Sequence, residues 1–286
     1  MSNKSGGAFE FRSIDVTGAY VEHFMPRIFD PLALVLLESA RFSRGEHMLD
    51  VACGPGTVAR MAAELVGPFG RVTATDISEE MLAVAQNLPG PKNPSVPVEY
   101  VASGIEALPF EDGEFDLVIC QQGLQFFPDK HAALLEMRRV LKSTGRVALA
   151  VWAQIDQCPY FEAMYHALKE TVPLELAEMI TVPFSFPFPN ALTFQMKEAG
   201  FCDVHVETVS RPLIFEEGVD HAIEAMNATP LAPKLKALEP ERHAAFMEAA
   251  RRYLKPLIWD DRVETMMVSN IAVGHCPNSP VKPQGT

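Results

Sequence analysis

Short apolar runs alternate with helical spacings through the first half of the chain. Runs of β character occur five times, at residues 47–53, 71–77, 98–103, 115–121 and 146–152. Between them apolar residues recur at helical spacing, most clearly at residues 57–66, 79–88 and 131–142. The run Leu117-Val118-Ile119 is apolar at every position, which is typical of a strand buried on both faces. The alternation therefore predicts an α/β fold with a doubly wound, mostly parallel sheet.

The pattern differs on either side of this region. Residues 20–39 read as a helix that breaks near Pro26 and restarts at Pro31, because proline is well suited to a first helical turn. After Trp152 come helical stretches, an irregular segment rich in Pro and Phe, and two alternating runs at residues 201–215 and 266–275. We expect these last two runs to be strands that complete the sheet.

Composition and charge narrow the classes of partner. The chain has 286 residues, of which 24 are basic and 37 acidic, so its net charge is −13. Such a surface repels phosphate backbones and anionic lipid headgroups, which argues against nucleic acid and membranes as partners. The five cysteines include no CxxC pair, so neither a disulfide framework nor a metal site is expected. With no signal peptide and no apolar run of 18 residues, we expect a cytoplasmic protein.

The segment Leu49-Asp50-Val51-Ala52-Cys53-Gly54-Pro55-Gly56-Thr57 carries the first candidate chemistry. A glycine-rich turn between a strand and a helix lets the backbone approach a ligand that a Cβ atom would exclude. Asp76 ends the next strand, 20 residues after Gly56, where a carboxylate can accept both hydroxyls of a ribose. These residues predict a site for a nucleoside-containing cofactor.

Two kinds of cofactor fit that turn. Gly54, Gly56 and Ala59 also match the dinucleotide fingerprint, so an NAD(P)-dependent oxidoreductase is one alternative. Against it, Asp50 lies inside the strand, where it suits a cationic amino group, which S-adenosylmethionine has and NAD lacks. Pro55 has no amide proton to donate to a pyrophosphate.

Five stretches in order resemble the class I S-adenosylmethionine-dependent methyltransferases, within them the ubiquinone/menaquinone-biosynthesis-like small-molecule branch. They are LDVACGPGT (49–57), VTATDIS (72–78), IEALPFEDGEFDLVIC (105–120), LQFFPD (124–129) and EMRRVLKSTGRVALAVW (136–152). The resemblance covers about residues 15–152. It implies a Rossmann-like seven-stranded sheet with an antiparallel terminal strand, and a helical lid or insert.

The resemblance also divides the chain into parts. It implies a helical lid at residues 1–45, a core for S-adenosylmethionine at 46–152 and a helical, aromatic insert for the acceptor at 153–200. Strands and helices that complete the sheet follow at 201–276. The polar, Pro-rich composition of residues 277–286 predicts a flexible tail. A homodimer is compatible with this layout.

The implied reaction is methyl transfer from S-adenosylmethionine to a small molecule by in-line displacement. The acceptor pocket is expected to combine residues 20–29 with aromatic residues of the insert, namely Phe161, Tyr165, Phe184, Phe186 and Phe188. This predicts an apolar or aromatic acceptor, with the methylated atom (O, S, N or C) left open. A methyltransferase-like protein that binds the cofactor without transferring methyl, in a regulatory or other role, is the second alternative.

The family's roles transfer to individual residues as follows. Asp50 is expected to bind the cofactor's ammonium through water, Asp76 the ribose, and Ile77 and Met81 the two faces of adenine. Together the expected cofactor contacts are Tyr20, Asp50, Ala52, Gly54, Gly56, Thr57, Asp76, Ile77, Met81, Ser103, Gly104, Ile105 and Gln121.

The catalytic residues stay unassigned, because methyl transfer from a sulfonium needs a general base only for some acceptors. Candidates for positioning are Tyr20 as a lid, Gln121, Gln122 and Phe126. Three of them have a plain structural alternative, which is a polar strand end for Gln121 and Gln122 and core packing for Phe126. Gly104 stands where the family places an Asp against the adenine amino group, so that contact would pass to Ser103 or a backbone carbonyl.

Overall fold

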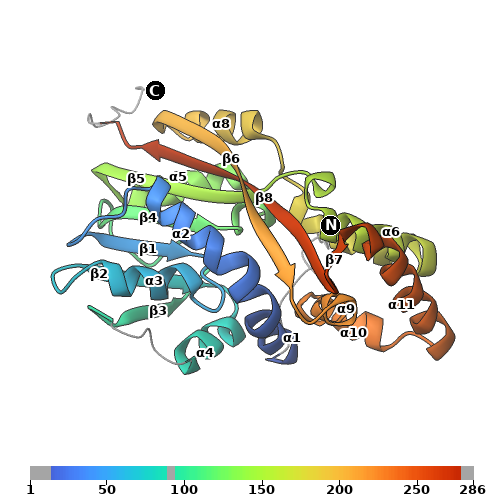
Figure 1. Ribbon diagram of the computed structural model, residues 1–286. Helices are drawn as coiled ribbons and strands as arrows, with labels where there is room; N and C mark the ends of the chain where they lie inside the picture. The colour runs from blue at the N-terminus through green and yellow to red at the C-terminus, as the bar shows by residue number, and fades with distance from the viewer. Residues whose placement is uncertain (1–13, 89–93, 278–286) are drawn as a thin grey trace, which may run out of the picture.

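A mixed β-sheet with helices on both faces forms the centre of the protein (Figure 1). The structure is a computed structural model that describes residues 14–88 and 94–277. The expected flexible tail at 277–286 lies, apart from its first residue, outside the described residues. No helix of the described ranges is long and apolar enough to cross a membrane.

Seven strands form the continuous sheet in the order β3-β2-β1-β4-β5-β8-β6, and a short eighth strand, β7, pairs with β8. The parallel strands are β1 (His47–Val51), β2 (Arg71–Asp76), β3 (Val98–Ala102), β4 (Phe115–Gln121) and β5 (Leu141–Trp152). The later strands are β6 (Cys202–Phe215), β7 (Ile258–Trp259) and β8 (Arg262–His275). β8 runs antiparallel between β5 and β6. The predicted fold class is confirmed, with β7 as the one strand that the sequence did not indicate.

Alternate side chains of the central strands point to opposite faces of the sheet, as the pleat requires. Leu117 and Ile119 of β4 pack into a core that includes α2 and α3, whereas Val118 and Cys120 pack toward α5 and α8. The helices that cover the two faces are α2 (Asp30–Ser39), α3 (Thr57–Leu65), α4 (Glu79–Asn87), α5 (Lys130–Val140) and α8 (Pro189–Glu198). Burial on both faces explains why the β4 sequence is apolar at consecutive positions.

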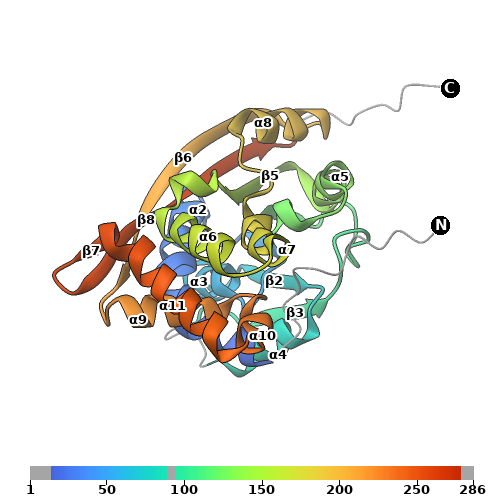
Figure 2. The same ribbon diagram turned by 90° about the vertical axis from the view of Figure 1, so that its right-hand side faces the viewer.

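A cap of helices lies beyond one end of the sheet, with α6 and α11 side by side (Figure 2). The first part of the cap comprises η3 (Ile155–Gln157), α6 (Pro159–Thr171), α7 (Leu174–Glu178) and η4 (Met179–Phe184). The second comprises α9 (Val219–Glu224), η5 (Ala225–Ala228), α10 (Ala232–Lys236), α11 (Pro240–Leu254) and η6 (Lys255–Leu257). β6 and β8 pair antiparallel and complete the sheet, as expected of the last two alternating runs. The chain between these two strands folds back onto α6 and buries apolar faces that the sheet cannot cover.

The N-terminal segment is one continuous helical path. It consists of α1 (Ile14–Ala19), the π-helix η1 (Tyr20–Phe29) and then α2, with Pro31 in the first turn of α2. The predicted break near Pro26 is wrong, since Pro26 lies inside η1. The wider π-helical turn accommodates a residue that has no amide proton and whose ring would clash in an α-helix.

Candidate active site

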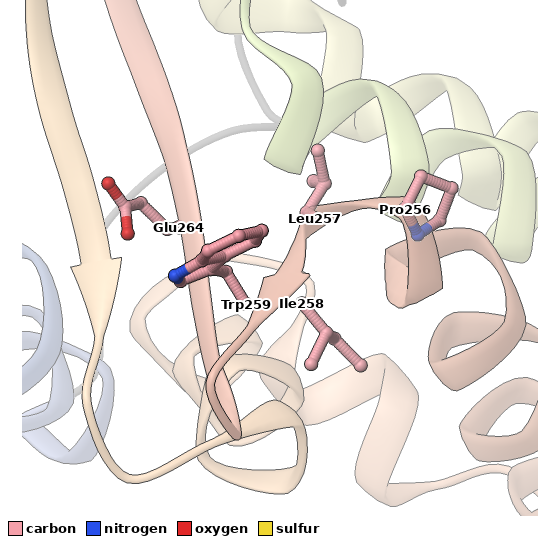
Figure 3. A pocket seen from close by; sticks show the side chains of 5 residues that line it. All are labelled: Pro256, Leu257, Ile258, Trp259 and Glu264. Atoms are coloured by element: carbon pink, nitrogen blue, oxygen red, sulfur yellow. The ribbon is translucent and has the colours of Figure 1, made fainter.

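A cavity of about 1310 Å³ lies at the carboxyl ends of the parallel strands. Its floor is made by the segments that follow β1, β2, β3 and β4, and its walls include η1 and residues of the cap. Ligands of doubly wound folds bind at this edge, where the loops from adjacent strands converge. A smaller hollow of about 390 Å³ lies at β7, lined by Pro256, Leu257, Ile258, Trp259 and Glu264 (Figure 3). It shares no residue with the large cavity.

Asp50 is a buried acid with no cationic partner among the described residues. It is 1 % exposed and lines the cavity from the penultimate position of β1. Its Oδ2 accepts a 3.0 Å hydrogen bond from the Ala59 amide, and its Oδ1 has no partner among the described residues. Burial is the main reason that its pKa rises to about 8. A cationic group in the cavity would supply the missing partner, so this site fits the ammonium of S-adenosylmethionine.

Asp76 and Gly54 form the next part of the floor. The two carboxylate oxygens of Asp76 accept 2.8 Å hydrogen bonds from the Gly54 and Ser78 amides, which fixes the carboxylate at the end of β2. Each oxygen retains a second lone pair for a ligand hydroxyl. Gly54 has φ +54°, and a Cβ added there would meet no protein atom within 4 Å. The open space beside the turn is what a closely approaching ligand requires. Ser78, not Asp76, caps α4.

Gly56 lies just outside the lining of the cavity. Its φ of +80° and its position before α3 explain the glycine, and a Cβ there would come within 2.7 Å of the Tyr100 hydroxyl oxygen. Gly56 therefore permits the left-handed turn before α3 and the close approach of Tyr100. Its expected contact with the cofactor stays a prediction.

The part of the cavity where adenine is expected to bind has two apolar residues and one unexpected acid. Met81 is buried, whereas the Ile77 side chain is 77 % exposed, which leaves an apolar surface for a ligand to cover. Ser103 lines the cavity, and its hydroxyl lies 3.0 Å from the Gly104 carbonyl oxygen and 3.4 Å from that of Ala107, so its one hydrogen can be donated to either.

At Gly104, where the resemblance expects an Asp, a Cβ atom would lie 2.5 Å from Oε2 of Glu106. The Glu106 carboxylate therefore occupies the space that a side chain at position 104 would fill. It also lines the cavity. The only signal for Glu106 in the sequence is its place two residues after Gly104.

The N-terminal π-helix η1 covers one side of the cavity. Tyr20 stacks on Phe29 with ring centroids 4.7 Å apart, and both line the cavity. Burial, with a smaller effect of the Asp76 charge, raises the pKa of Tyr20 well above its ordinary value. Gln121 at the end of β4 donates a 2.9 Å hydrogen bond to the Phe29 carbonyl. The structure thus brings together two of the residues expected to position substrates, Tyr20 and Gln121, through Phe29.

Two non-glycine residues with positive φ follow adjacent strands at the cavity. Ala52 (φ +54°) comes after β1 and Gln122 (φ +57°) after β4, and both line the cavity. Left-handed backbone is unfavourable for residues with a Cβ atom and is concentrated at functional sites. The sequence identified both residues as candidates, but nothing in it indicated the strain.

The aromatic wall agrees only in part with the expected residues. Phe161 and Phe184 line the cavity, together with Phe24, Phe29 and Trp152. The other three expected aromatic residues, Tyr165, Phe186 and Phe188, do not. Tyr165 packs against the core of the cap, Phe186 packs on the α5–α8 side of the sheet, and Phe188 is exposed. The structure adds residues 228–231, which the sequence could not indicate because they lie about 75 positions after Trp152.

The remaining candidates all lie at the cavity. Thr57, Ile105 and Phe126 line it, and Phe126 is 38 % exposed rather than core packing. Apart from Gly56, every residue expected to contact cofactor or position a substrate is part of one surface. Their individual roles stay predictions.

Comparison with known proteins points the same way. A family model described as a methyltransferase domain matches residues 49–149. Demethylmenaquinone methyltransferase of Staphylococcus aureus is 36 % identical over 177 residues, which cover 58 % of this chain and 71 % of that protein. The ubiquinone/menaquinone biosynthesis C-methyltransferase of Bradyrhizobium diazoefficiens is 29 % identical over 199 residues, covering 66 % and 78 %.

A solved structure shows the same fold. Phosphoethanolamine N-methyltransferase 2 of Haemonchus contortus, in complex with S-adenosylmethionine, has a TM-score of 0.59 and 21 % identity, covering 95 % of this chain and 61 % of that one. The matching domain model extends from β1 to β5, and the two relatives are methyltransferases. The chain belongs to the class I S-adenosylmethionine-dependent methyltransferases, in the branch of the ubiquinone and menaquinone biosynthesis enzymes.

Proposed function

We propose that this enzyme methylates a small aromatic acceptor that binds in the same cavity as S-adenosylmethionine. One observation carries the proposal: a single cavity is lined at one side by two acids, Asp50 and Asp76, and at another by Trp152, Phe161 and Phe184. The acids suit a nucleoside-containing cation, and the aromatic side chains suit a flat apolar molecule. A shared cavity lets the two ligands meet.

In this proposal the acidic side binds the cofactor, which supplies an electrophilic methyl group on a sulfonium. Asp50 Oδ1 faces the ammonium, directly or through water. Asp76 accepts the ribose hydroxyls, and adenine lies between Ile77 and Met81. The exposure of Ile77 and the unpaired Oδ1 of Asp50 support these assignments.

Glu106 takes the place of the acid that the family carries at position 104. Its Oε2 lies where a Cβ atom of residue 104 would be, near Ile77, and Glu106 lines the cavity, which supports its carboxylate as the acceptor for the adenine amino group. A carboxylate forms stronger hydrogen bonds than a neutral hydroxyl, so Glu106 is the better acceptor than Ser103 at this position.

The aromatic side aligns the acceptor and excludes water. Alignment for an in-line displacement contributes up to about 7–11 kcal/mol to catalysis. Among the described residues that line the cavity there is no His, Lys or Arg. This favours an acceptor that reacts without a strong protein base, such as a phenolate, a thiolate or a stabilised carbanion. The quinone-biosynthesis C-methyltransferase relative supports an aromatic ring carbon as one candidate.

Calorimetry with S-adenosylmethionine, S-adenosylhomocysteine and NADH tests the cofactor, and mass spectrometry of an acceptor panel tests the reaction. We expect both sulfur compounds to bind, NADH not to bind, and aromatic phenols or thiols to gain 14 Da more readily than aliphatic amines. Asp76→Asn should weaken binding of both sulfur compounds. Its matched control is Asp116→Asn, because Asp116 also accepts a backbone amide but lies outside the cavity.

Tight NADH binding without sulfonium binding would contradict the proposal. Bound cofactor without any methylated product would favour a methyltransferase-like protein with another role. We also place the enzyme in the cytoplasm, since all five cysteines are unpaired and a reducing compartment keeps them so.

A further inference from the structure

A chain of buried hydrogen bonds leads from the sheet to the aromatic side of the cavity. It contains Gln125, Gln122 and Ser269, which are 4 %, 6 % and 0 % exposed. Gln125 Nε2 donates to Gln122 Oε1 at 3.4 Å, and Gln122 Nε2 donates to Ser269 Oγ at 2.8 Å. Ser269 Oγ donates to the Val151 carbonyl at 2.9 Å. The chain thus begins at the cavity and ends at a carbonyl of β5.

The direction of the chain follows from its last member. A backbone carbonyl can only accept, so the single hydroxyl hydrogen of Ser269 is used on Val151. Ser269 Oγ must then accept from a donor, which fixes the amide nitrogen of Gln122 toward it and the Gln122 oxygen away from it. That oxygen accepts from the Gln125 nitrogen. Hydrogen bonding therefore fixes where the nitrogen and the oxygen of each side-chain amide lie.

This direction leaves one acceptor unused. Gln125 Oε1 is buried and has no hydrogen-bond partner among the described residues. Gln125 cannot rotate its amide to correct this without placing two oxygens, or two nitrogens, against each other. Its backbone is also held, since Ser185 Oγ donates to its carbonyl at 3.5 Å. A buried carbonyl without a donor is unfavourable, and Gln125 lines the cavity that the acceptor would enter.

We infer that Gln125 Oε1 accepts a hydrogen bond from the methyl acceptor, which is therefore an aromatic molecule that carries an O–H or N–H donor apart from the atom that receives the methyl group. This inference rests on the proposed function and adds a specificity-determining residue to it. The neighbouring cavity residues Phe126, Phe127, Trp152 and Phe184 would contact the ring, while Gln125 selects the donor. Aromatic molecules of the same size without a donor would leave the carbonyl unpaired.

Binding of three naphthalene probes tests the inference without requiring turnover. In the presence of S-adenosylhomocysteine, calorimetry compares 1-naphthol, 1-naphthylamine and 1-methoxynaphthalene. The wild type should bind at least one of the two donors about five- to tenfold more tightly than the methoxy compound, as expected for one buried hydrogen bond. Preference for 1-naphthol would identify a hydroxyl as the donor, and preference for 1-naphthylamine would identify an amine. Gln125→Leu should remove the preference, because it removes the acceptor oxygen.

Gln86→Leu serves as the matched control, since Gln86 is exposed on α4 and does not line the cavity. It should keep the wild-type preference. The inference is overturned if the wild type does not discriminate between the probes, or if Gln125→Leu discriminates as well as the wild type. Binding of S-adenosylhomocysteine is measured first in each variant. Its absence in the wild type would contradict the proposed function, whereas its presence without a donor preference contradicts the role of Gln125 alone.

Discussion

The side-chain amide of Gln121 donates a 2.9 Å hydrogen bond to the main-chain carbonyl of Phe29. The bond joins the carboxyl end of β4 to the last residue of η1, 92 positions earlier in the chain. Phe29 in turn packs on Tyr20 and on Trp152, with ring centroids 4.7 and 5.9 Å apart. One buried amide thus connects the floor of the cavity to the helix that covers it.

Replacing Gln121 by Leu should loosen this cover. The Phe29 carbonyl would lose its side-chain donor, and we expect unfolding free energy to fall by about 1–3 kcal/mol. Methyl transfer should fall by more than cofactor affinity, because alignment depends on a fixed cover. Thermal unfolding and the ratio of kcat to cofactor affinity check this, with Gln86→Leu as control. An unchanged kcat together with an unchanged melting temperature would show that the Gln121–Phe29 hydrogen bond contributes neither to stability nor to the position of η1.

Cofactor affinity should increase with pH up to about pH 8. Burial raises the pKa of Asp50 to about 8, so the carboxyl is protonated at neutral pH before the cofactor binds. A bound ammonium favours the ionised form, so binding releases a proton. Affinity should therefore rise by up to about tenfold per pH unit between pH 6 and pH 8 and level off above that.

Calorimetry with S-adenosylmethionine across this range measures the slope. Asp50→Asn should flatten it and weaken binding at about pH 8, while Asp116→Asn should leave it unchanged. If Asp50→Asn kept the wild-type slope, the titrating group would be another acid. The first candidate would be Asp76, whose pKa is also raised mainly by burial.

Moving one carboxylate tests the role of Glu106. Glu106→Ala should lower affinity for S-adenosylhomocysteine by about tenfold or more, as expected for a lost hydrogen bond to a charged acceptor. The double variant Gly104→Asp with Glu106→Ala returns a carboxylate to the same space and should recover most of that loss. Recovery is the decisive measurement, since damage to the loop would not be repaired by a second substitution. If Glu106→Ala binds S-adenosylhomocysteine as tightly as the wild type, Glu106 does not bind the adenine amino group, and a backbone carbonyl remains as its acceptor.

The two turn glycines should respond differently to alanine. Gly56→Ala combines strained backbone with a contact to Tyr100 at 2.7 Å, and should lower stability by about 2–3 kcal/mol. Gly54→Ala meets no protein atom, so it should cost only about 1–2 kcal/mol of strain but reduce cofactor affinity sharply. Thermal melts and calorimetry separate the two effects. Partial recovery of Gly56→Ala stability by Tyr100→Phe would identify the hydroxyl as the obstacle; no recovery would leave backbone strain as the cause.

The core of the site was predictable because its signals are local. Asp50, Gly54 and Asp76 belong to strand-turn-helix units whose geometry follows from a few neighbouring residues, and parallel strands bring their carboxyl ends to one edge. The identity of the β strands followed from consecutive apolar residues, as in Leu117-Val118-Ile119. The break assigned to Pro26 was wrong because Pro26 lies inside a π-helix, whose wider turn accommodates the residue without an amide proton.

The sequence by itself determined the fold class, the cofactor edge and most residues that line it, since hydrophobic periodicity and turn chemistry act over short distances. Only the tertiary structure decided which aromatic residues reach the cavity and that Glu106 fills the space beside Gly104. It also decided that Gln125 ends a chain anchored by Ser269, 144 positions later. Such relationships depend on packing between segments far apart in the chain, and no local pattern encodes the direction of a hydrogen bond across them.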